Sequence, residues 1–218
     1  MLILDIFAAR ARTSEGKIQV ELAQLKYRAS RLAGFGRSMS RLGGGIGTRG
    51  PGEKKLEIDR RLIGHRTAQL NRELKEVVRH RELTRSQRMK SHTKVAAIVG
   101  YTNAGKSTLL NTLTDADVLE EDQLFATLDP TTRMLELSNH QNLMLTDTVG
   151  FIRKLPHHLV DAFKSTLEEA KYADFIIHVV DASNPQWDAQ MHVVYMTLQD
   201  LGVVDKKILT VFNKCDRI

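Results

Sequence analysis

The 218-residue chain has few of the residues that stabilise small secreted proteins. It contains one cysteine, so no internal disulfide can form, and aromatic residues make up only 6% of the sequence. No apolar run approaches the ~20 residues that cross a bilayer, and no segment resembles a secretory signal. These absences argue against a disulfide-stapled or membrane-spanning protein and predict a reducing, cytoplasmic location. The length allows a sizeable core and two domains.

Charge is distributed unevenly along the chain, although the net charge is only +6. Residues 17–94 contain 20 Lys and Arg against 7 Asp and Glu, a net charge of +13. Residues 95–218 contain 10 against 17, a net charge of −7, and residues 1–16 contain two of each. This difference in net charge predicts two structural units with different binding partners. The basic segment is typical of a protein that contacts nucleic-acid phosphates.

The basic segment has the apolar spacing of two long helices. Apolar residues recur at intervals of four and three in its first part, and mainly every seven residues in its second. The first set is Ile18, Leu22, Leu25, Ala29 and Leu32, and the second is Leu56, Ile63, Leu70, Leu74 and Val77. Between them, residues 43–52 form a glycine-rich stretch that no helix tolerates. We therefore expect an antiparallel, coiled-coil-like hairpin with a glycine-rich tip, its second helix running from about Glu53 to Ser91.

The second helix carries many arginines and few acids to pair with them. They are Arg60, Arg61, Arg66, Arg72, Arg79, Arg81, Arg85 and Arg88. A solvated helix face is the ordinary explanation for a charged run, but this one-sided excess favours contact with a polyanion. The tip also contains G-x-G-x-x-G, but no strand leads into it, which disfavours a dinucleotide site. RNA, whose shape is read through its backbone, is the expected target.

A phosphate-binding loop is predicted at residues 100–107, with the sequence GYTNAGKS. It fits the pattern G-x-x-x-x-G-K-[ST] and lies between an apolar, strand-like run and a helix start. In such a loop, backbone amides and the helix N-terminus surround the phosphates. Lys106 is expected to reach the β- and γ-phosphates, and Ser107 to bind Mg²⁺. The other predicted nucleotide contacts in the loop are Gly100, Tyr101, Thr102, Asn103, Ala104 and Gly105.

Two further motifs, DTVG at residues 147–150 and NKCD at residues 213–216, follow apolar runs. Asp147 is expected to hold Mg²⁺ through water. Gly150 is expected to donate its N–H to the γ-phosphate. The DTVG motif adds Thr148 and Val149 as predicted nucleotide contacts.

The NKCD motif is expected to read the base. The carboxylate of Asp216 can accept hydrogen bonds from N1–H and the 2-amino group of guanine, and the stem of Lys214 would lie across the ring. Adenine offers neither donor and would leave the carboxylate unpaired. The motif therefore predicts GTP and disfavours a helicase-like ATPase. Asn213 and Cys215 complete the predicted base-reading residues.

A switch loop is expected at residues 124–133, a polar segment that contains proline. One threonine in it should bind Mg²⁺ through its hydroxyl and touch the γ-phosphate through its backbone. The residues alone leave three candidates, Thr127, Thr131 and Thr132.

Strands and helices are predicted to alternate after residue 94. Strands are expected at residues 95–99, 134–137, 143–147, 175–181 and 208–212, and helices at 108–113, 160–172 and 189–201. This order predicts an α/β fold, a P-loop domain with a mostly parallel sheet and the nucleotide at the carboxyl ends of the strands. Residues 2–7 are also expected to form a strand.

Five strings together resemble HflX-type GTPases, ribosome-associated members of the Obg-like translational GTPases. They are GGGIGTRGPGEKKLEIDRR, GYTNAGKSTLLN, QLFATLDPTTR, DTVGFIRKLPHHLVDAFKSTLEE and NKCD. The resemblance covers almost the whole chain. It implies a cytoplasmic, monomeric GTPase that binds the large ribosomal subunit, splits or rescues ribosomes, and points its hairpin at rRNA.

The resemblance also implies roles for the switch loop. It selects Thr127 as the threonine that binds Mg²⁺. Together with Lys106 and Gly150, Thr127 is expected to act in hydrolysis, in which developing charge on the γ-phosphate must be stabilised. The nucleotide contacts implied in this loop are Phe125, Ala126, Thr127, Leu128 and Asp129.

Relative to this family, the sequence looks truncated at both ends. Residues 1–16 would be a remnant of an upstream α/β domain, residues 17–93 the basic hairpin with its tip at 43–52, and residues 94–218 the GTPase domain. That domain would lack its last strand, guanine-contacting loop and final helix, so loss of activity is one expected outcome. An RNA-binding hairpin with an inert GTPase domain is then the alternative function.

Many GTPases have a water-orienting glutamine directly after the glycine of the DTVG-type motif. This chain has Phe151, whose side chain cannot hydrogen-bond to water. We therefore expect slow intrinsic hydrolysis that ribosomes accelerate.

Overall fold

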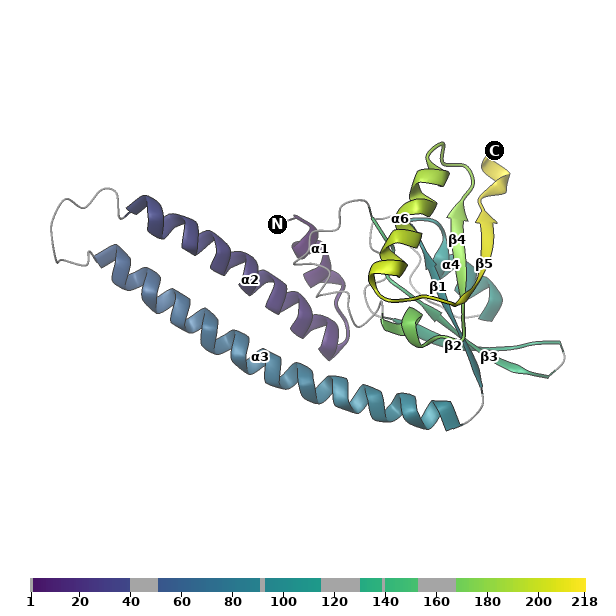
Figure 1. Ribbon diagram of the computed structural model, residues 1–218, viewed down its shortest axis with the longest axis horizontal. Helices are drawn as coiled ribbons and strands as arrows, with labels where there is room; N and C mark the ends of the chain where they lie inside the picture. The colour runs from purple at the N-terminus through teal and green to yellow at the C-terminus, as the bar shows by residue number, and fades with distance from the viewer. Residues whose placement is uncertain (1, 40–50, 91–92, 115–129, 139, 153–167) are drawn as a thin grey trace.

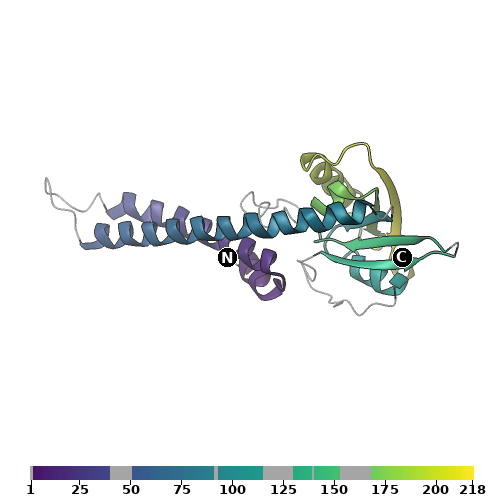
Figure 2. The same cartoon turned by 90° about the horizontal axis from the view of Figure 1, so that it is seen from below.

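The computed structural model describes residues 2–39, 51–90, 93–114, 130–138, 140–152 and 168–218. In these residues a long helical hairpin extends away from a five-stranded sheet that carries helices on both faces (Figure 1). Figure 2 shows the same arrangement from below, with the hairpin projecting from one end of the sheet domain. No helix within the described ranges is long and apolar enough to cross a membrane.

The hairpin consists of α2 (Ser14–Met39) and α3 (Pro51–Lys90), which run antiparallel as predicted (Figure 1). Their seam contains the predicted apolar residues, with Ile18, Leu22, Leu25 and Leu70 buried and Ile63, Leu74 and Val77 packed against them. The expectation that residues 51–52 belong to the non-helical tip is wrong, because α3 begins at Pro51, a residue well suited to a first helical turn. The rest of the expected tip lies outside the described residues.

Residues 2–7 form part of a helix, so the predicted strand there is wrong. Helix α1 spans Leu2–Arg10 and places Leu4 and Phe7 in the core, with 2% and 0% of their surfaces exposed. These two residues are three positions apart and share one face of a helix, whereas in a strand they would point to opposite faces. Tertiary burial of this face therefore decides the conformation.

The sheet contains five strands in the order β2-β3-β1-β4-β5. The strands are β1 (Lys94–Gly100), β2 (Thr131–Glu136), β3 (Asn142–Asp147), β4 (Phe175–Asp181) and β5 (Lys207–Asn213). All neighbouring pairs are parallel except the β2–β3 hairpin, which confirms the prediction of a mostly parallel sheet. The carboxyl ends of β1, β3, β4 and β5 therefore meet at one edge.

Helices cover both faces of this sheet. On one face, Leu110 of α4 (Lys106–Thr114) packs on Ile98, Leu145 and Val179. On the other face lies α6 (Trp187–Asp200), which buries Val194 and Leu198. Of the helix predicted at residues 160–172, the structure describes only residues 168–172, which are helical. The short helix η1 (Cys215–Arg217) follows β5.

The hairpin and the sheet domain share one hydrophobic core. Phe7 of α1 and Val20 and Ala23 of α2 belong to the same buried cluster as Val99 of β1 and Phe151. The first turns of the hairpin are therefore packed on the sheet domain.

An ion-pair cluster reinforces this junction. Arg81 of α3 contacts Glu15 of α2 at 3.0 Å and Glu168 of the sheet domain at 2.5 Å, and its side chain is only 18% exposed. Within the hairpin itself, Arg66 of α3 makes two hydrogen bonds to Glu21 of α2, at 2.7 and 3.0 Å. For Arg66 and Arg81, the expectation that these arginines face few acids is therefore wrong.

Candidate functional site

The phosphate-binding loop connects β1 to α4 at the carboxyl edge of the sheet. Asn103 and Gly105 have positive φ angles of 61° and 93°, which turn the chain around the loop. A side chain at position 105 would collide with the amide nitrogen of Asn213, so glycine is required there both by space and by backbone angle. The loop ends at Lys106, the first residue of α4, so the amino end of the helix faces the space that the loop encloses.

Lys106 points back into this loop. Its ammonium group donates a hydrogen bond to the carbonyl oxygen of Tyr101 at 3.0 Å, and only 6% of the residue is exposed. Burial lowers the pKa of Lys106 to about 8, although the nearby carboxylate of Asp147 opposes this shift. A phosphate group placed in the loop would favour the charged form of Lys106.

The two predicted magnesium ligands that the structure describes are adjacent. Ser107 Oγ donates a hydrogen bond to Asp147 Oδ2 at 2.6 Å, and Asp147 ends β3 fully buried. A hydroxyl and a carboxylate are hard oxygen ligands, the type that Mg²⁺ binds in phosphate sites, so this pair fits the ion.

The structure describes only part of the predicted switch loop. Residues 125–129, including Thr127, lie outside the described residues, so the choice of Thr127 stays a prediction. Thr131 and Thr132 begin β2, and the hydroxyl of Thr132 hydrogen-bonds with that of Thr146 at 2.9 Å. Thr132 therefore already serves the β2–β3 pairing.

The end of the DTVG motif lies directly against the phosphate loop. Thr148 Oγ1 donates to the carbonyl oxygen of Ile98 at 2.7 Å, which anchors the motif to β1. A side chain at position 150 would come within 2.6 Å of Thr102 Cα and 3.1 Å of Lys106 Nζ, so only glycine fits. Gly150 is thus held close to Lys106.

Phe151 attaches the end of this motif to the phosphate loop through its backbone. Its N–H donates to the carbonyl oxygen of Gly100 at 3.0 Å, and its carbonyl oxygen accepts from the N–H of Thr102 at 2.8 Å. Its side chain is 4% exposed and lies in the core shared with α1 and α2. The ring therefore packs against the hairpin and is directed away from solvent.

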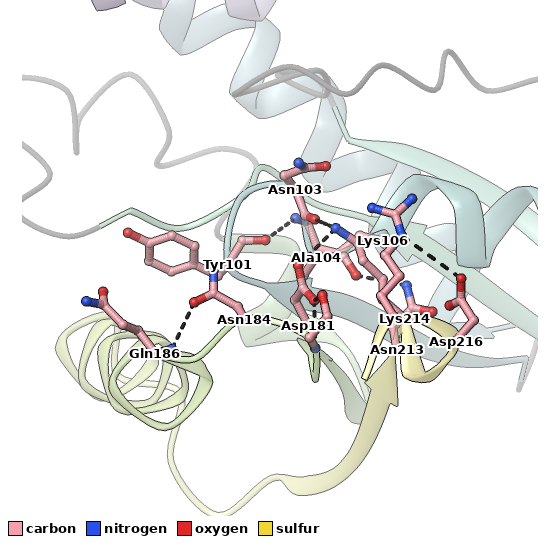
Figure 3. A network of polar contacts seen from close by, with 12 residues as sticks. Tyr101, Asn103, Ala104, Lys106, Asp181, Asn184, Gln186, Asn213, Lys214 and Asp216 are labelled. Atoms are coloured by element: carbon pink, nitrogen blue, oxygen red, sulfur yellow. Dashed lines mark hydrogen bonds and ion pairs between the residues drawn. The ribbon is translucent and has the colours of Figure 1, made fainter.

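Two side chains of the NKCD motif hydrogen-bond to the phosphate loop (Figure 3). Asn213 Nδ2 donates to the carbonyl oxygen of Ala104 at 2.9 Å, and Lys214 Nζ donates to that of Asn103 at 2.7 Å. Asp216 lies at the surface in η1, with its side chain 81% exposed and a carboxylate oxygen 4.0 Å from Arg217 Nε. Cys215 is also exposed.

Sequence reasoning missed one member of this network. Asp181, at the end of β4, accepts a hydrogen bond from Lys214 Nζ at 2.9 Å and another from the hydroxyl of Ser183 at 2.6 Å. Its only signal in the sequence was an acidic residue at the end of a predicted strand. The register of β4 and β5, which places Asp181 beside Asn213, could not be deduced from either motif.

Comparisons with known proteins agree with this geometry. Residues 10–88 match the family profile "GTP-binding GTPase Middle Region", and residues 95–214 match "50S ribosome-binding GTPase". "GTPase HflX" of Lacrimispora saccharolytica is 71% identical over 216 residues, which cover 99% of this chain and 51% of that protein. "GTPase HflX" of Caldanaerobacter subterraneus is 61% identical over 215 residues, 99% of this chain and 50% of that protein.

A solved structure with a similar fold aligns over the full length of the chain. The GTP-binding protein of Sulfolobus solfataricus, crystallised with GDP, superposes with a TM-score of 0.58 at 31% identity, covering 100% of this chain and 55% of that one. The chain spans about half the length of the curated relatives that it matches. It belongs to the 50S ribosome-binding GTPase family, and its HflX-type resemblance is confirmed over nearly its whole length.

Proposed function

We propose that the chain binds GTP and GDP with Mg²⁺, hydrolyses GTP, and acts as the nucleotide switch of a factor that associates with the large ribosomal subunit. The observation that carries this proposal is the convergence of three distant segments on one loop. Ser107 meets Asp147 at 2.6 Å, Phe151 pairs with Gly100, and Lys214 binds Asn103. Each segment contributes a group of the type that a guanine nucleotide and its metal ion require.

Each part of the site has a distinct task in hydrolysis. The loop amides, Lys106 and Gly150 would stabilise the negative charge that develops on the γ-phosphate. Ser107, Asp147 (through water) and Thr127 would hold Mg²⁺, which neutralises phosphate charge when bound. Phe151 supplies no group that orients water, so the intrinsic rate is slow and a ribosomal partner completes the site.

The hairpin would contact rRNA through phosphates. Arg60, Arg61 and Arg72 are exposed on α3, whereas Arg66 and Arg81 are engaged by carboxylates. A surface of this charge binds polyanions mainly by releasing their counterions. A role in splitting or rescuing ribosomes, as a cytoplasmic monomer, is consistent with such a contact.

Two measurements test the proposal. Fluorescent GDP and GTP are titrated into the chain with Mg²⁺, with ATP as competitor, and Lys106→Ala serves as the control without the phosphate-binding cation. We expect saturable binding that GDP competes and ATP does not, and its loss in the control. Sedimentation with isolated large subunits, with a non-hydrolysable GTP analogue, tests the partner. Absence of nucleotide binding by the wild-type chain would refute the switch, and absence of co-sedimentation would refute the ribosomal partner.

A further inference from the structure

Asp181 lies where the base-reading segment meets the phosphate loop. It ends β4 directly beside Asn213 of β5, and the N–H of Ala182 donates to the carbonyl oxygen of Asn213 at 2.9 Å. Figure 3 shows the Asp181 side chain close to Lys214 and Asn103, at the centre of the network. No nucleotide-binding motif of the chain includes this residue.

The two carboxylate oxygens of Asp181 have separate partners. Oδ1 accepts hydrogen bonds from Ser183, from the hydroxyl at 2.6 Å and from the backbone N–H at 3.1 Å. Oδ2 accepts from Lys214 Nζ at 2.9 Å. The side chains of Asp181 and Lys214 are only 15% and 16% exposed. Since both oxygens are engaged, the carboxylate has a fixed orientation.

This environment keeps Asp181 ionised. Burial favours the neutral form, but the hydrogen bonds from Ser183 and Lys214, together with the charge of Lys214, outweigh it and hold the pKa below its usual range. The ion pair is thus present at neutral pH, in a partly desolvated place where it is stronger than an exposed pair.

The consequence for Lys214 is a fixed side chain on an uncommon backbone. Lys214 has a φ of 60°, a left-handed conformation that an ordinary residue adopts only when its surroundings compensate. Its ammonium group joins Asp181 to the carbonyl oxygen of Asn103, whose φ of 61° is also left-handed. With both ends of Lys214 fixed, its four-carbon stem has one defined path between them.

We propose that Asp181 is a positioning residue for guanine-nucleotide binding, acting through Lys214. It fixes the position of the Lys214 stem, which offers an apolar surface to the purine ring, relative to the phosphate loop. The site then needs less ordering when the nucleotide binds, which raises affinity without a direct contact to the ligand. This inference rests on the proposed GTP site and adds a residue that decides its affinity.

A double-mutant cycle tests whether Asp181 acts through Lys214. The variants are Asp181→Asn, Lys214→Met and the double variant, and the measurement is the Kd of fluorescent GDP. Lys214→Met keeps an apolar stem and removes the ammonium group. We expect Asp181→Asn to weaken GDP binding about 10-fold, the size of one lost charge-assisted hydrogen bond. In the Lys214→Met background, the same change should alter Kd by about twofold or less, because its partner is already gone.

Two readouts separate positioning from general destabilisation. Asp205→Asn is the matched control, because Asp205 is exposed and its φ of 58° suits asparagine equally well. It should leave the Kd unchanged. Asp181→Asn should weaken the binding of GDP and of IDP by the same factor, since the Lys214 stem does not contact the 2-amino group that distinguishes the two nucleotides.

The outcomes distinguish this inference from the proposed function. If the wild-type chain binds GDP but Asp181→Asn binds equally well, or if the loss persists in the Lys214→Met background, Asp181 does not position Lys214. A changed GDP-to-IDP ratio would also overturn the inference, by showing that Asp181 acts on base reading at Asp216. If the wild-type chain binds no guanine nucleotide, the proposed function fails first and the inference fails with it.

Discussion

Replacement of Phe151 should lower stability and leave the chemical step nearly unchanged. The ring is 4% exposed and packs in a core that includes Phe7, Val20 and Ala23. Truncation of a buried phenylalanine to alanine typically lowers the free energy of unfolding by about 3–5 kcal/mol. A loss of that size approaches the total stability of many domains, about 5–15 kcal/mol, so Phe151→Leu is the better variant. Its similar volume limits the expected loss to about 1 kcal/mol.

The backbone of residue 151 does not need the ring to keep its place. Its N–H and carbonyl oxygen bind Gly100 and Thr102, at 3.0 and 2.8 Å, and leucine retains both bonds. Gly150 should therefore remain close to the ammonium group of Lys106. We expect the single-turnover rate of GTP hydrolysis by Phe151→Leu to stay within about threefold of wild type, because the ring offers no hydrogen bond to the attacking water. Removal of a group that stabilises the transition state would instead lower the rate about 100- to 1,000-fold.

The assay combines urea unfolding, followed by circular dichroism, with single-turnover hydrolysis at saturating protein. Phe7→Leu is the matched control, since Phe7 is fully buried in the same core but lies on α1, outside the DTVG motif. Both variants should lose similar stability and keep similar rates. A rate that falls 100-fold in Phe151→Leu, with stability matching the control, would show that the ring takes part in catalysis and would refute this reasoning.

Three further predictions concern stability and RNA binding. Arg81→Met should lower the free energy of unfolding by about 3 kcal/mol in urea titrations, because it leaves two carboxylates without their partly buried cation. His178→Leu should remove a loss of stability that wild type shows as the pH falls from 6.5 to 4. Burial, with a smaller contribution from Lys106, lowers the pKa of folded His178 to about 4. Between pH 6.5 and 4 the unfolded state therefore binds more protons than the folded state, and the free energy of unfolding falls by about 3 kcal/mol. Affinity for large ribosomal subunits should fall on the order of 1,000-fold between roughly 50 and 200 mM salt if about six phosphates are neutralised.

The two stability predictions each have a control. Lys94→Met removes an ion pair to Asp174 whose lysine side chain is 72% exposed, and should change stability by less than about 1 kcal/mol. His140→Gln, at a side chain 91% exposed, should keep the acid-dependent loss. An Arg81→Met loss no larger than that of Lys94→Met, or an unchanged acid profile in His178→Leu, would contradict the corresponding prediction. Ribosome affinity that is independent of salt would contradict the phosphate contact.

The sequence predicted the sheet well because its motifs lie at strand ends. The motifs at residues 100–107, 147–150 and 213–216 mark the ends of β1, β3 and β5, and the apolar runs mark all five strands. The predicted strand positions are therefore confirmed, and only the strand ends differ by a few residues. The sequence does not reveal the first helix, because a short, mostly apolar segment such as residues 2–7 fits a strand and a buried helix equally well. Its conformation is decided by Leu4 and Phe7 meeting the core, which only the assembled fold determines.

Residues that act through partners distant in sequence were also missed. Asp181 is separated from Lys214 by 33 positions and Arg81 from Glu168 by 87, and no local pattern marks either pair. The difference in charge between the hairpin and the GTPase domain predicts two separate structural units. The first turns of the hairpin nevertheless share a core with β1, which the charge distribution alone does not reveal.

The phosphate loop is held in place by two neighbours, and one of them also belongs to the core that the hairpin shares with the sheet domain. Lys214 fixes the carbonyl oxygen of Asn103, and Phe151 occupies the N–H of Thr102. Under the proposed function, a movement of Gly150 toward a γ-phosphate would disturb the adjoining backbone hydrogen bonds of Phe151, whose ring lies in a core that α1 and α2 help to form. Packed cores resist continuous deformation, so such a shift favours a discrete rearrangement at the base of the hairpin. Under the proposed function, Phe151 would then connect the nucleotide site to the hairpin.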